Sequence, residues 1–205
     1  MHIVDGALSN PVVIGGAVAA AGGIALGLRA LPLERIPAAG VLSAAFFVAS
    51  LIHVPLGPSS IHLMLNGLAG LILGWAAFPA LFVGLTLQAV FFGFGGLTVL
   101  GVNAVNIALP AVLTGVIFGR LVARSRPLAA AIWGGIGGAF AIALTTILVA
   151  LSLALTGREF LAAAHLVLVA HLPLMAVEGV LTGFAVLLAR KVKPDLFTAL
   201  REAPA

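Results

Sequence analysis

The feature that most constrains this chain is a run of residues, from Ile36 to Gly119, in which no side chain carries a formal charge. A water-soluble domain normally has about 25% charged residues, because they cover its surface. Here only 8% of the residues are charged and 62% are hydrophobic, with a mean hydropathy of +1.28. A chain of this composition cannot present a polar surface to water, so its surroundings must be mostly lipid.

The basic residues predict how the chain crosses the membrane, because cytoplasmic loops are enriched in Lys and Arg. Both groups that flank the uncharged run should be cytoplasmic, so an even number of crossings separates them. Two crossings would leave about half of the run as an apolar loop, whereas four use its whole length. The four basic groups are Arg29/Arg35, Arg120/Arg124/Arg126, Arg158, and Arg190/Lys191/Lys193/Arg201.

Breakers rich in Pro, Gly and Ser mark where these crossings begin and end. Each transmembrane helix needs about 20 apolar residues. We therefore expect an all-α integral membrane protein with a single domain over residues 1–205, formed by a tail at 1–10 and about seven helices. The predicted helices span roughly 11–31, 38–52, 61–77, 79–97, 104–120, 128–154 and 166–189.

The same basic residues predict the orientation. None precedes the first apolar stretch, which is unlike a cleaved signal peptide, whereas Arg29 and Arg35 follow it. This places the N-terminus outside and the C-terminus in the cytoplasm. Of the ten Lys and Arg residues only Arg158, beside Glu159, then faces outward. The expected location is the inner (cytoplasmic) membrane of the cell.

Polar residues gather on the outer side of this arrangement. In lipid such groups are rare, and they are either functional or hydrogen-bonded. Histidines that converge on one face indicate a metal site. The residues expected on the outer side are His2, Asp5, His53, His62, Asn103 and His165.

Three asparagines accompany these histidines. Asn66 follows His62 by four residues, so the two share a face of the predicted helix. Asn103 and Asn106, three residues apart, also share a face. Asn66 is therefore a candidate for the lining of the outer cavity. For Asn103 and Asn106 two interpretations stay open: they line that cavity, or they bridge neighbouring helices by hydrogen bonds.

The first two residues form a chelating group. The α-amine of Met1, the deprotonated amide nitrogen of His2 and its Nδ1 can bind one metal ion in fused, coplanar rings. The α-amine has a pKa of about 7.7–8.0, so a metal ion can displace its proton near neutral pH. A planar nitrogen set suits Ni(II) or Cu(II). His62 is the best-placed fourth donor, with His53 next, and Asp5 could orient an imidazole N–H.

Small residues recur at four-residue spacing, which lets helices approach closely in lipid. Most such pairs are expected to pack the bundle internally. The stripe Ala17, Ala21 and Ala25 on the first helix has three members, and we interpret it as a docking surface for another protein.

Glu178 lies deep in the last predicted helix and shares a face with His171. An ionised carboxylate in the hydrocarbon region is costly. A structural role, or a role in transport together with His171, are both open at this point.

Three separated motifs carry a resemblance to a known family. The first is Met1-His2-Ile3-Val4-Asp5-Gly6, and the second is the turn "GPSSIH", which ends at His62. The third combines Gln88, the glycine-rich "FGFGG" at 92–96 and a pair of asparagines after Gly101. In order and spacing, residues 1–115 resemble the nickel/cobalt substrate-specific membrane subunits (S components) of energy-coupling-factor (ECF) transporters. Ala7 and Pro58 depart from the family pattern, and neither removes a nitrogen ligand.

The resemblance implies seven helices and a transported Ni(II) or Co(II) ion bound by the Met1 amine, the amide and imidazole of His2, and the imidazole of His62. It implies no permanent cofactor. The implied partners are a transmembrane coupling protein and two cytoplasmic ATPase subunits, sometimes with a further small membrane subunit. The chain itself has no G-x-x-x-x-G-K-[ST] phosphate loop, so we expect a substrate-capture subunit that is not an enzyme.

Two other functions are less consistent with the sequence. A self-sufficient, proton-linked secondary metal transporter would use His171 and Glu178 as its coupling site. An intramembrane hydrolase lacks support, because neither H-E-x-x-H nor G-x-S-x-G occurs. Between the two ions, a four-nitrogen square plane favours Ni(II), although the family handles both.

Overall fold

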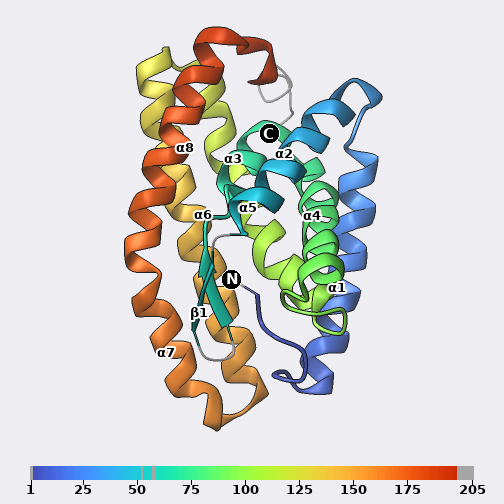
Figure 1. Cartoon of the computed structure of the whole chain (residues 1–205). Helices are drawn as coiled ribbons and strands as arrows, with labels where there is room; N and C mark the ends of the chain where they lie inside the picture. The colour runs from blue at the N-terminus through green and yellow to red at the C-terminus, as the bar shows by residue number, and fades with distance from the viewer. Residues whose placement is uncertain (1, 52, 57–58, 198–205) are drawn as a thin grey trace.

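The computed structural model describes residues 2–51, 53–56 and 59–197, and it is a bundle of long helices with one small hairpin (Figure 1). Short 3₁₀ turns at Leu33–Arg35, Gly74–Ala76, Arg158–Phe160 and Pro194–Phe197 link or end the helices. The helices are α1 (Asn10–Arg29), α2 (Ile36–Ala49), α3 (Asn66–Leu73), α4 (Ala77–Phe92), α5 (Leu100–Arg124), α6 (Pro127–Thr156), α7 (Leu161–Ala170) and α8 (Leu172–Val192). The hairpin pairs β1 (His53–Leu56) with β2 (Ser59–His62) in antiparallel register.

The predicted fold class is confirmed. Within the described ranges, five helical segments are long and apolar enough to cross a membrane. They are α1, the joined α3–α4 segment (Asn66–Phe92), α5, α6 and α8. The chain is therefore a multi-pass, all-α membrane protein, whereas its orientation in the membrane stays a prediction.

The largest departure from the predicted helices is at 61–77. The helix there begins only at Asn66, because residues 59–62 form β2 and pair His62 with His53. Serine is a weak helix former, since its hydroxyl competes for backbone groups, and "PSSIH" lies where the helix was expected to start. The preceding helix also ends early, at Ala49, where the Ser50 hydroxyl donates to the carbonyls of Phe46 and Phe47 at 2.9 and 3.0 Å.

Two other helix ends differ for local reasons. The helix predicted to reach residue 97 ends at Phe92, because Gly93 takes a left-handed conformation with φ +65° and closes the helix. The last predicted helix, 166–189, is two helices, α7 and α8, that meet at His171. Pro173 follows directly, and its missing N–H cannot continue the hydrogen bonds of α7.

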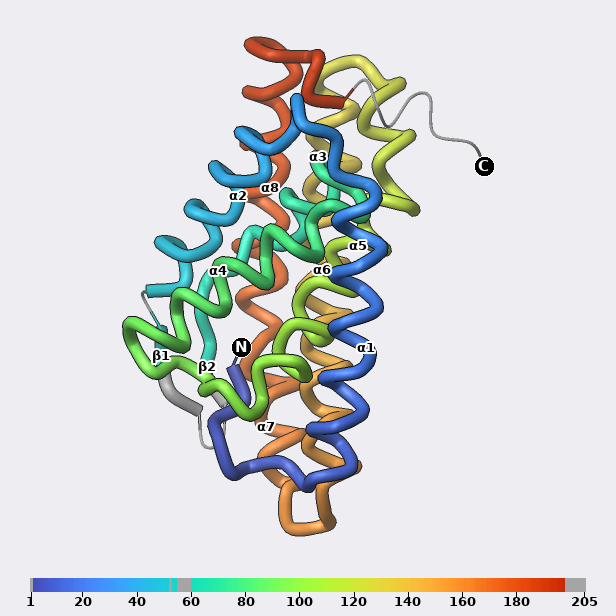
Figure 2. Tube along the Cα trace, turned by 90° about the vertical axis from the view of Figure 1, so that its right-hand side faces the viewer, coloured from blue at the N-terminus to red at the C-terminus, as the bar shows by residue number. Residues whose placement is uncertain are grey.

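Helix α3 occupies the middle of the bundle. It runs away from the hairpin, and the chain then reverses at Gly74 (φ +58°) so that α4 returns toward the hairpin level (Figure 2). Seven of its eight residues are buried. A methyl group at Gly70 would overlap the backbone carbonyl of Ala111 on α5, so glycine permits this close approach.

The basic side chains lie mostly at one end. In the described part of the chain, Arg158 sits at the end near α7, and the other Lys and Arg residues lie where α1, α5 and α8 finish and α2 and α6 start, at the top of Figure 1. The tail and the hairpin lie away from that end. This separation agrees with the charge pattern from which the topology was predicted.

Candidate metal centre

The N-terminal tail is an integral part of the core. From the lower end of α1 it runs into the bundle and stops beside the hairpin (Figure 1). The Asn103 side chain on α5 binds the tail by two hydrogen bonds. The Ile3 N–H donates to Oδ1 at 2.9 Å, and Nδ2 donates to the Ile3 carbonyl at 3.0 Å. The Ile3 side chain is fully buried. Asn103 therefore positions the backbone directly after His2.

Asp5 holds the same tail at a second point. Its Oδ1 accepts from the Thr98 hydroxyl at 2.5 Å, and from the backbone N–H groups of Thr98 and Val99 at 3.2 and 3.4 Å. These donors precede α5, where the helix dipole favours a negative charge. These contacts do not support the hypothesis that Asp5 orients an imidazole, because both ring nitrogens of His2 lack a hydrogen-bond partner and Oδ1 of Asp5 is bound just before α5.

The glycine-rich segment between α4 and α5 makes room for the tail. Gly95 and Gly96 have φ values of +78° and +111°, which side-chain-bearing residues rarely adopt. A Cβ at Gly96 would overlap the carboxylate of Asp5, and one at Gly95 would lie 2.8 Å from Nδ2 of Asn103. The "FGFGG" motif thus allows the tail to pack against this loop.

His2 and His62 come together inside this closed end of the bundle. Their ring centres are 4.6 Å apart and their planes differ by 18°. The two residues are 4% and 3% exposed. Burial disfavours the charged form, so it lowers the pKa of both imidazoles well below the ordinary histidine value. Burial therefore favours the neutral imidazole, which is the form that binds metals.

The nitrogen atoms of these rings are suited to coordination. Nδ1 and Nε2 of His2 are buried without a hydrogen-bond partner, which is costly unless a ligand occupies them. Nδ1 of His62 contacts the Leu63 carbonyl at 2.9 Å. Because a carbonyl only accepts, this nitrogen carries the proton and the lone pair is on Nε2.

The distance between the two ring centres, 4.6 Å, suits two ligands of one ion, whereas their stacked planes would have to rotate before both rings could direct a nitrogen lone pair at that ion. Imidazoles bound at right angles, with metal–nitrogen distances of about 2.0 Å, have ring centres roughly 4–5 Å apart. A third contact lies beside them: the His2 backbone N–H points to the Ser60 hydroxyl at 3.5 Å. The sequence alone gives Ser60 no role beyond its place in the "GPSSIH" motif.

Side chains alone do not complete a metal site. Over residues 2–51, 53–56 and 59–197, no group of three or more His, Cys, Asp or Glu side chains could hold an ion. A metal ion at His2 and His62 would therefore need donors from the backbone or the chain terminus. The predicted ligand Met1 lies outside the described residues.

His53 is exposed, unlike its strand partner His62. Its ring packs edge-on against Phe94 with ring centres 4.3 Å apart, while Phe94 lies nearly parallel to His2 at 6.3 Å. Phe94 thus lies against the rings of both His53 and His2, a placement that the sequence did not predict. The only signal was its position inside "FGFGG".

Two of the candidate cavity residues bridge helices instead. Nδ2 of Asn66 donates to the Ile107 carbonyl at 3.0 Å and to the Thr145 hydroxyl at 3.1 Å, joining α3 to α5 and α6. Asn106 exchanges hydrogen bonds with the hydroxyl of Ser152 at 3.2 and 3.3 Å, joining α5 to α6. The interpretation that Asn66 and Asn106 line the outer cavity is therefore not supported by their contacts.

His171 and Glu178 use separate partners. Nδ1 of His171 donates to the Val167 carbonyl at 2.6 Å, and its Nε2 is buried without a partner. Glu178 accepts hydrogen bonds from the backbone of Met64 and Leu65, at the start of α3. Glu178 is thus joined to the segment that follows His62.

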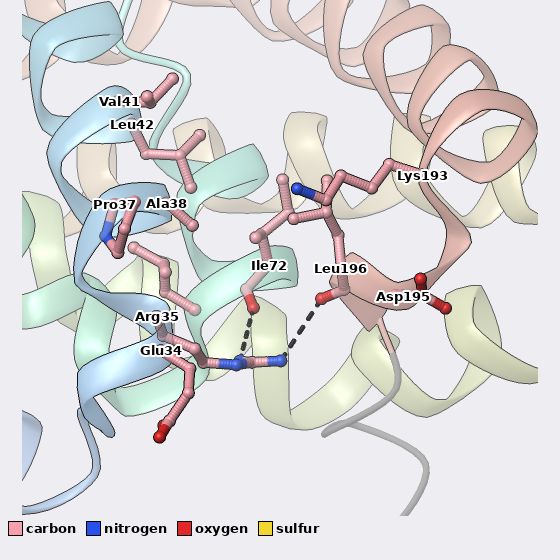
Figure 3. Close-up of a pocket in the computed structure, with 11 residues that line it drawn as sticks. Glu34, Arg35, Pro37, Ala38, Val41, Leu42, Ile72, Lys193, Asp195 and Leu196 are labelled. Carbon is pink, nitrogen blue, oxygen red and sulfur yellow. Dashed lines mark hydrogen bonds between the residues drawn. The ribbon is translucent and has the colours of Figure 1, made fainter.

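A cavity of about 660 Å³ borders the C-terminal end of α3, where Ile72 and Leu73 line it. Figure 3 shows its lining residues. The Arg35 side chain lines this cavity and donates to the carbonyls of Ile72 and Leu196 at 3.0 and 3.4 Å. The remaining lining is largely aliphatic. This cavity offers no metal ligand set, because its charged groups are two carboxylates and two cations: Glu34, Asp195, Arg35 and Lys193.

The predicted docking residues Ala17, Ala21 and Ala25 are all exposed on α1. The opposite face of α1 packs the bundle through glycines: a Cβ at Gly16 would overlap Val102, and one at Gly23 would overlap Phe78. α1 lies along the outside of the bundle in Figure 2. The alanine stripe is therefore accessible to another protein within the membrane.

Comparison with known proteins gives a consistent result. Residues 2–196 match the family described as cobalt uptake substrate-specific transmembrane region. A metal transport protein of Haemophilus influenzae is 41% identical over 203 residues, covering 96% of each chain. The cobalt transport protein CbiM of Sorangium cellulosum is 32% identical over 178 residues, covering 80% of this chain and 77% of that one.

A solved structure shares the fold. The crystal structure of a transition metal transporter superposes with a TM-score of 0.73 at 26% identity, covering 98% of this chain and 97% of the other. The similarity therefore extends over the tail, the hairpin and all of the helices.

Proposed function

This chain belongs to the family of cobalt uptake substrate-specific transmembrane regions, and we propose that it captures nickel or cobalt for an ATP-driven ECF uptake transporter. The family is a membrane component of metal uptake. The proposal adds how the ion is held and what supplies the energy. It rests on one observation above all: the imidazole of His2 is buried with both nitrogens unpartnered, against the imidazole of His62.

The proposed ligands are the Met1 amine, the amide nitrogen and Nδ1 of His2, and Nε2 of His62. Three facts support this set. The His62 proton is on Nδ1, so Nε2 is the donor. Asn103 and Asp5 hold the tail, which places His2 without using its side chain. In the described part of the chain no cluster of acidic or sulfur side chains competes as an alternative site.

Four nitrogen donors in a plane suit Ni(II), whereas Co(II) would more readily take further axial ligands. We therefore expect the purified protein to prefer nickel. Ni(II) in such a field is diamagnetic and has a distinctive visible absorption, which separates a four-nitrogen plane from an octahedral site with oxygen ligands.

The energy is proposed to come from partner subunits. The chain has no phosphate-binding loop, so ATP hydrolysis belongs to two cytoplasmic ATPases joined through a transmembrane coupling protein, sometimes with a further small membrane subunit. The exposed stripe Ala17, Ala21 and Ala25 is the proposed docking surface for the coupling protein. Small residues allow another helix to approach α1 closely.

Two measurements test this function. First, metal analysis of the purified chain should find about one equivalent of Ni²⁺ after exposure to Ni²⁺ and removal of excess, and His2→Ala should lose it. Second, the chain reconstituted alone in vesicles should not accumulate Ni²⁺ when a proton gradient is imposed. Uptake by the chain alone under that gradient would instead support the proton-linked transporter that uses His171 and Glu178.

A further inference from the structure

The connection between β2 and α3 is three residues long, and it joins His62 to the most buried helix of the bundle. Leu65 within it has φ +51°, the one positive φ among non-glycine residues in the described chain. A residue persists in this conformation when its surroundings over-determine it. The neighbour that does so here is Glu178 on α8.

Glu178 is 1% exposed, and its carboxylate is aimed at the backbone of this connection. Its Oε1 accepts a hydrogen bond from the Met64 N–H, and the Leu65 N–H donates to both carboxylate oxygens at 3.1 Å. These N–H groups lie at the N-terminus of α3, where the helix dipole stabilises a negative charge. The interaction therefore ties α8 to the connection through hydrogen bonds to two successive backbone N–H groups.

The Met64 N–H and the Leu63 carbonyl belong to the same peptide group. That group is planar, so the direction of its N–H determines the direction of its carbonyl. The Leu63 carbonyl is the group that accepts the proton of Nδ1 of His62 at 2.9 Å. One rigid peptide thus lies between the Glu178 carboxylate and the His62 imidazole.

We propose that Glu178 is a positioning residue of the metal centre, which acts through the Leu63–Met64 peptide to fix the tautomer and direction of the His62 imidazole. Metal-bound histidines commonly donate their second N–H to a carboxylate or a carbonyl, which orients the ring. Here the carbonyl is that of Leu63, the residue after His62. The Glu178 carboxylate binds the N–H at the opposite edge of the same peptide group. This inference rests on the proposed function, because it requires His62 to be a metal ligand.

The expected effect follows from this arrangement. Without the carboxylate the peptide can rotate, and Nε2 of His62 no longer faces a fixed point. Loss of an outer-shell partner typically lowers metal affinity about 10- to 100-fold. Glu178→Ala should fall in this range. Glu178→Gln keeps the size of the side chain and one acceptor oxygen, although its NH₂ group then faces an N–H donor. Because one acceptor remains, its loss of Ni²⁺ affinity should be smaller than that of Glu178→Ala.

The test is a titration of six full-length proteins in detergent with Ni²⁺, followed by visible absorption. They are the wild type, Glu178→Ala, Glu178→Gln, His62→Ala, the double variant Glu178→Ala with His62→Ala, and Ser152→Ala. The last removes a buried hydrogen bond between α5 and α6 that does not involve this peptide, and its Ni²⁺ affinity should equal that of the wild type.

The proposal expects two results together. Glu178→Ala shifts the Ni²⁺ spectrum toward that of His62→Ala, because both weaken the same ligand. The double variant binds within about twofold of His62→Ala alone, because a positioning residue has no effect once its ligand is gone. If Glu178→Ala does not fold, Glu178→Gln and its double variant with His62→Ala carry the same comparison.

Other results overturn the proposal in recognisable ways. Unchanged Ni²⁺ affinity in the Glu178 variants removes the positioning role. A double variant that is weaker than His62→Ala by the full factor of the single change shows that Glu178 only stabilises the fold. A wild type that does not bind Ni²⁺, or a His62→Ala protein that binds normally, instead rejects the proposed metal centre itself.

Discussion

The two ends of helix α3 differ in how they are built. At its start the backbone meets Glu178, the hairpin and the inserted tail, and the two imidazoles beside it are buried. At its finish Arg35 binds the Ile72 carbonyl and borders a cavity of about 660 Å³. We call the start of α3 the filled end and its finish, beside the cavity, the open end. The candidate metal centre is at the filled end. A metal ion needs donor atoms at about 2 Å rather than volume, so the chain itself occupies most of the space around it.

The comparison predicts that the filled end is intolerant of change and the open end tolerant. The strongest test is to add one residue before Met1. The Met1 nitrogen would then become a peptide amide, and the free α-amine would move to the added residue, away from the position that the proposed ligand requires. Ni²⁺ binding should be abolished, as measured by metal analysis after gel filtration. Retained stoichiometric binding would show that the amine is not a ligand.

The second test separates the two histidines of the hairpin. His62→Ala removes a proposed ligand, and its Ni²⁺ affinity should fall by more than the 10- to 100-fold typical of outer-shell changes. His53→Ala is the matched control, since His53 pairs with His62 in the hairpin but is exposed. Its affinity should stay within a few-fold of wild type. The reverse order of effects would move the fourth ligand to His53.

The third test addresses the hydrogen bonds by which Asn103 holds the N-terminal tail. Asn103→Ala removes both hydrogen bonds to Ile3, so His2 is no longer held in place and Ni²⁺ affinity should fall about 10- to 100-fold. Asn106→Ala, three residues further along α5, removes only the bridge to Ser152. It should lower thermal stability by an amount equivalent to about 1 kcal/mol and leave the affinity unchanged. Equal affinities for the two variants would contradict the role given to Asn103.

The fourth test moves to the exposed face of α1. Ala21→Leu adds a bulky side chain where a coupling protein is proposed to dock, so ATP-driven uptake by the whole transporter should fall several-fold. Ni²⁺ binding by the isolated chain should not change, because the site is formed by other elements. Uptake at the wild-type rate would place the docking surface elsewhere.

The smallest effect is expected at the open end. Ala38→Phe places a large side chain in the cavity beside Arg35, and the Ni²⁺ affinity of the isolated chain should stay within about twofold of wild type. This expectation follows from the location of the cavity at the opposite end of α3. A loss of affinity comparable to that of Asn103→Ala would show that the two ends are coupled through α3.

Much of the fold was predictable, because lipid imposes a simple rule on hydropathy and charge. The uncharged run from Ile36 to Gly119 required several apolar membrane segments, and the chain reverses within this run at Gly74. What was mispredicted was local. The strand at 59–62 replaced the start of a helix, because pairing with 53–56 satisfies its backbone in a way that hydropathy does not reveal.

The sequence by itself determined the class of protein and identified His2 and His62 as a pair, because these depend on composition, spacing and motif. Tertiary structure alone decided which polar groups serve that pair. Asp5 turned to α5, Asn66 joined helices, and Glu178 reached the connection behind His62 from more than a hundred residues away in the chain. Such partnerships are set by the direction of hydrogen bonds in space, and spacing along a chain does not contain that direction.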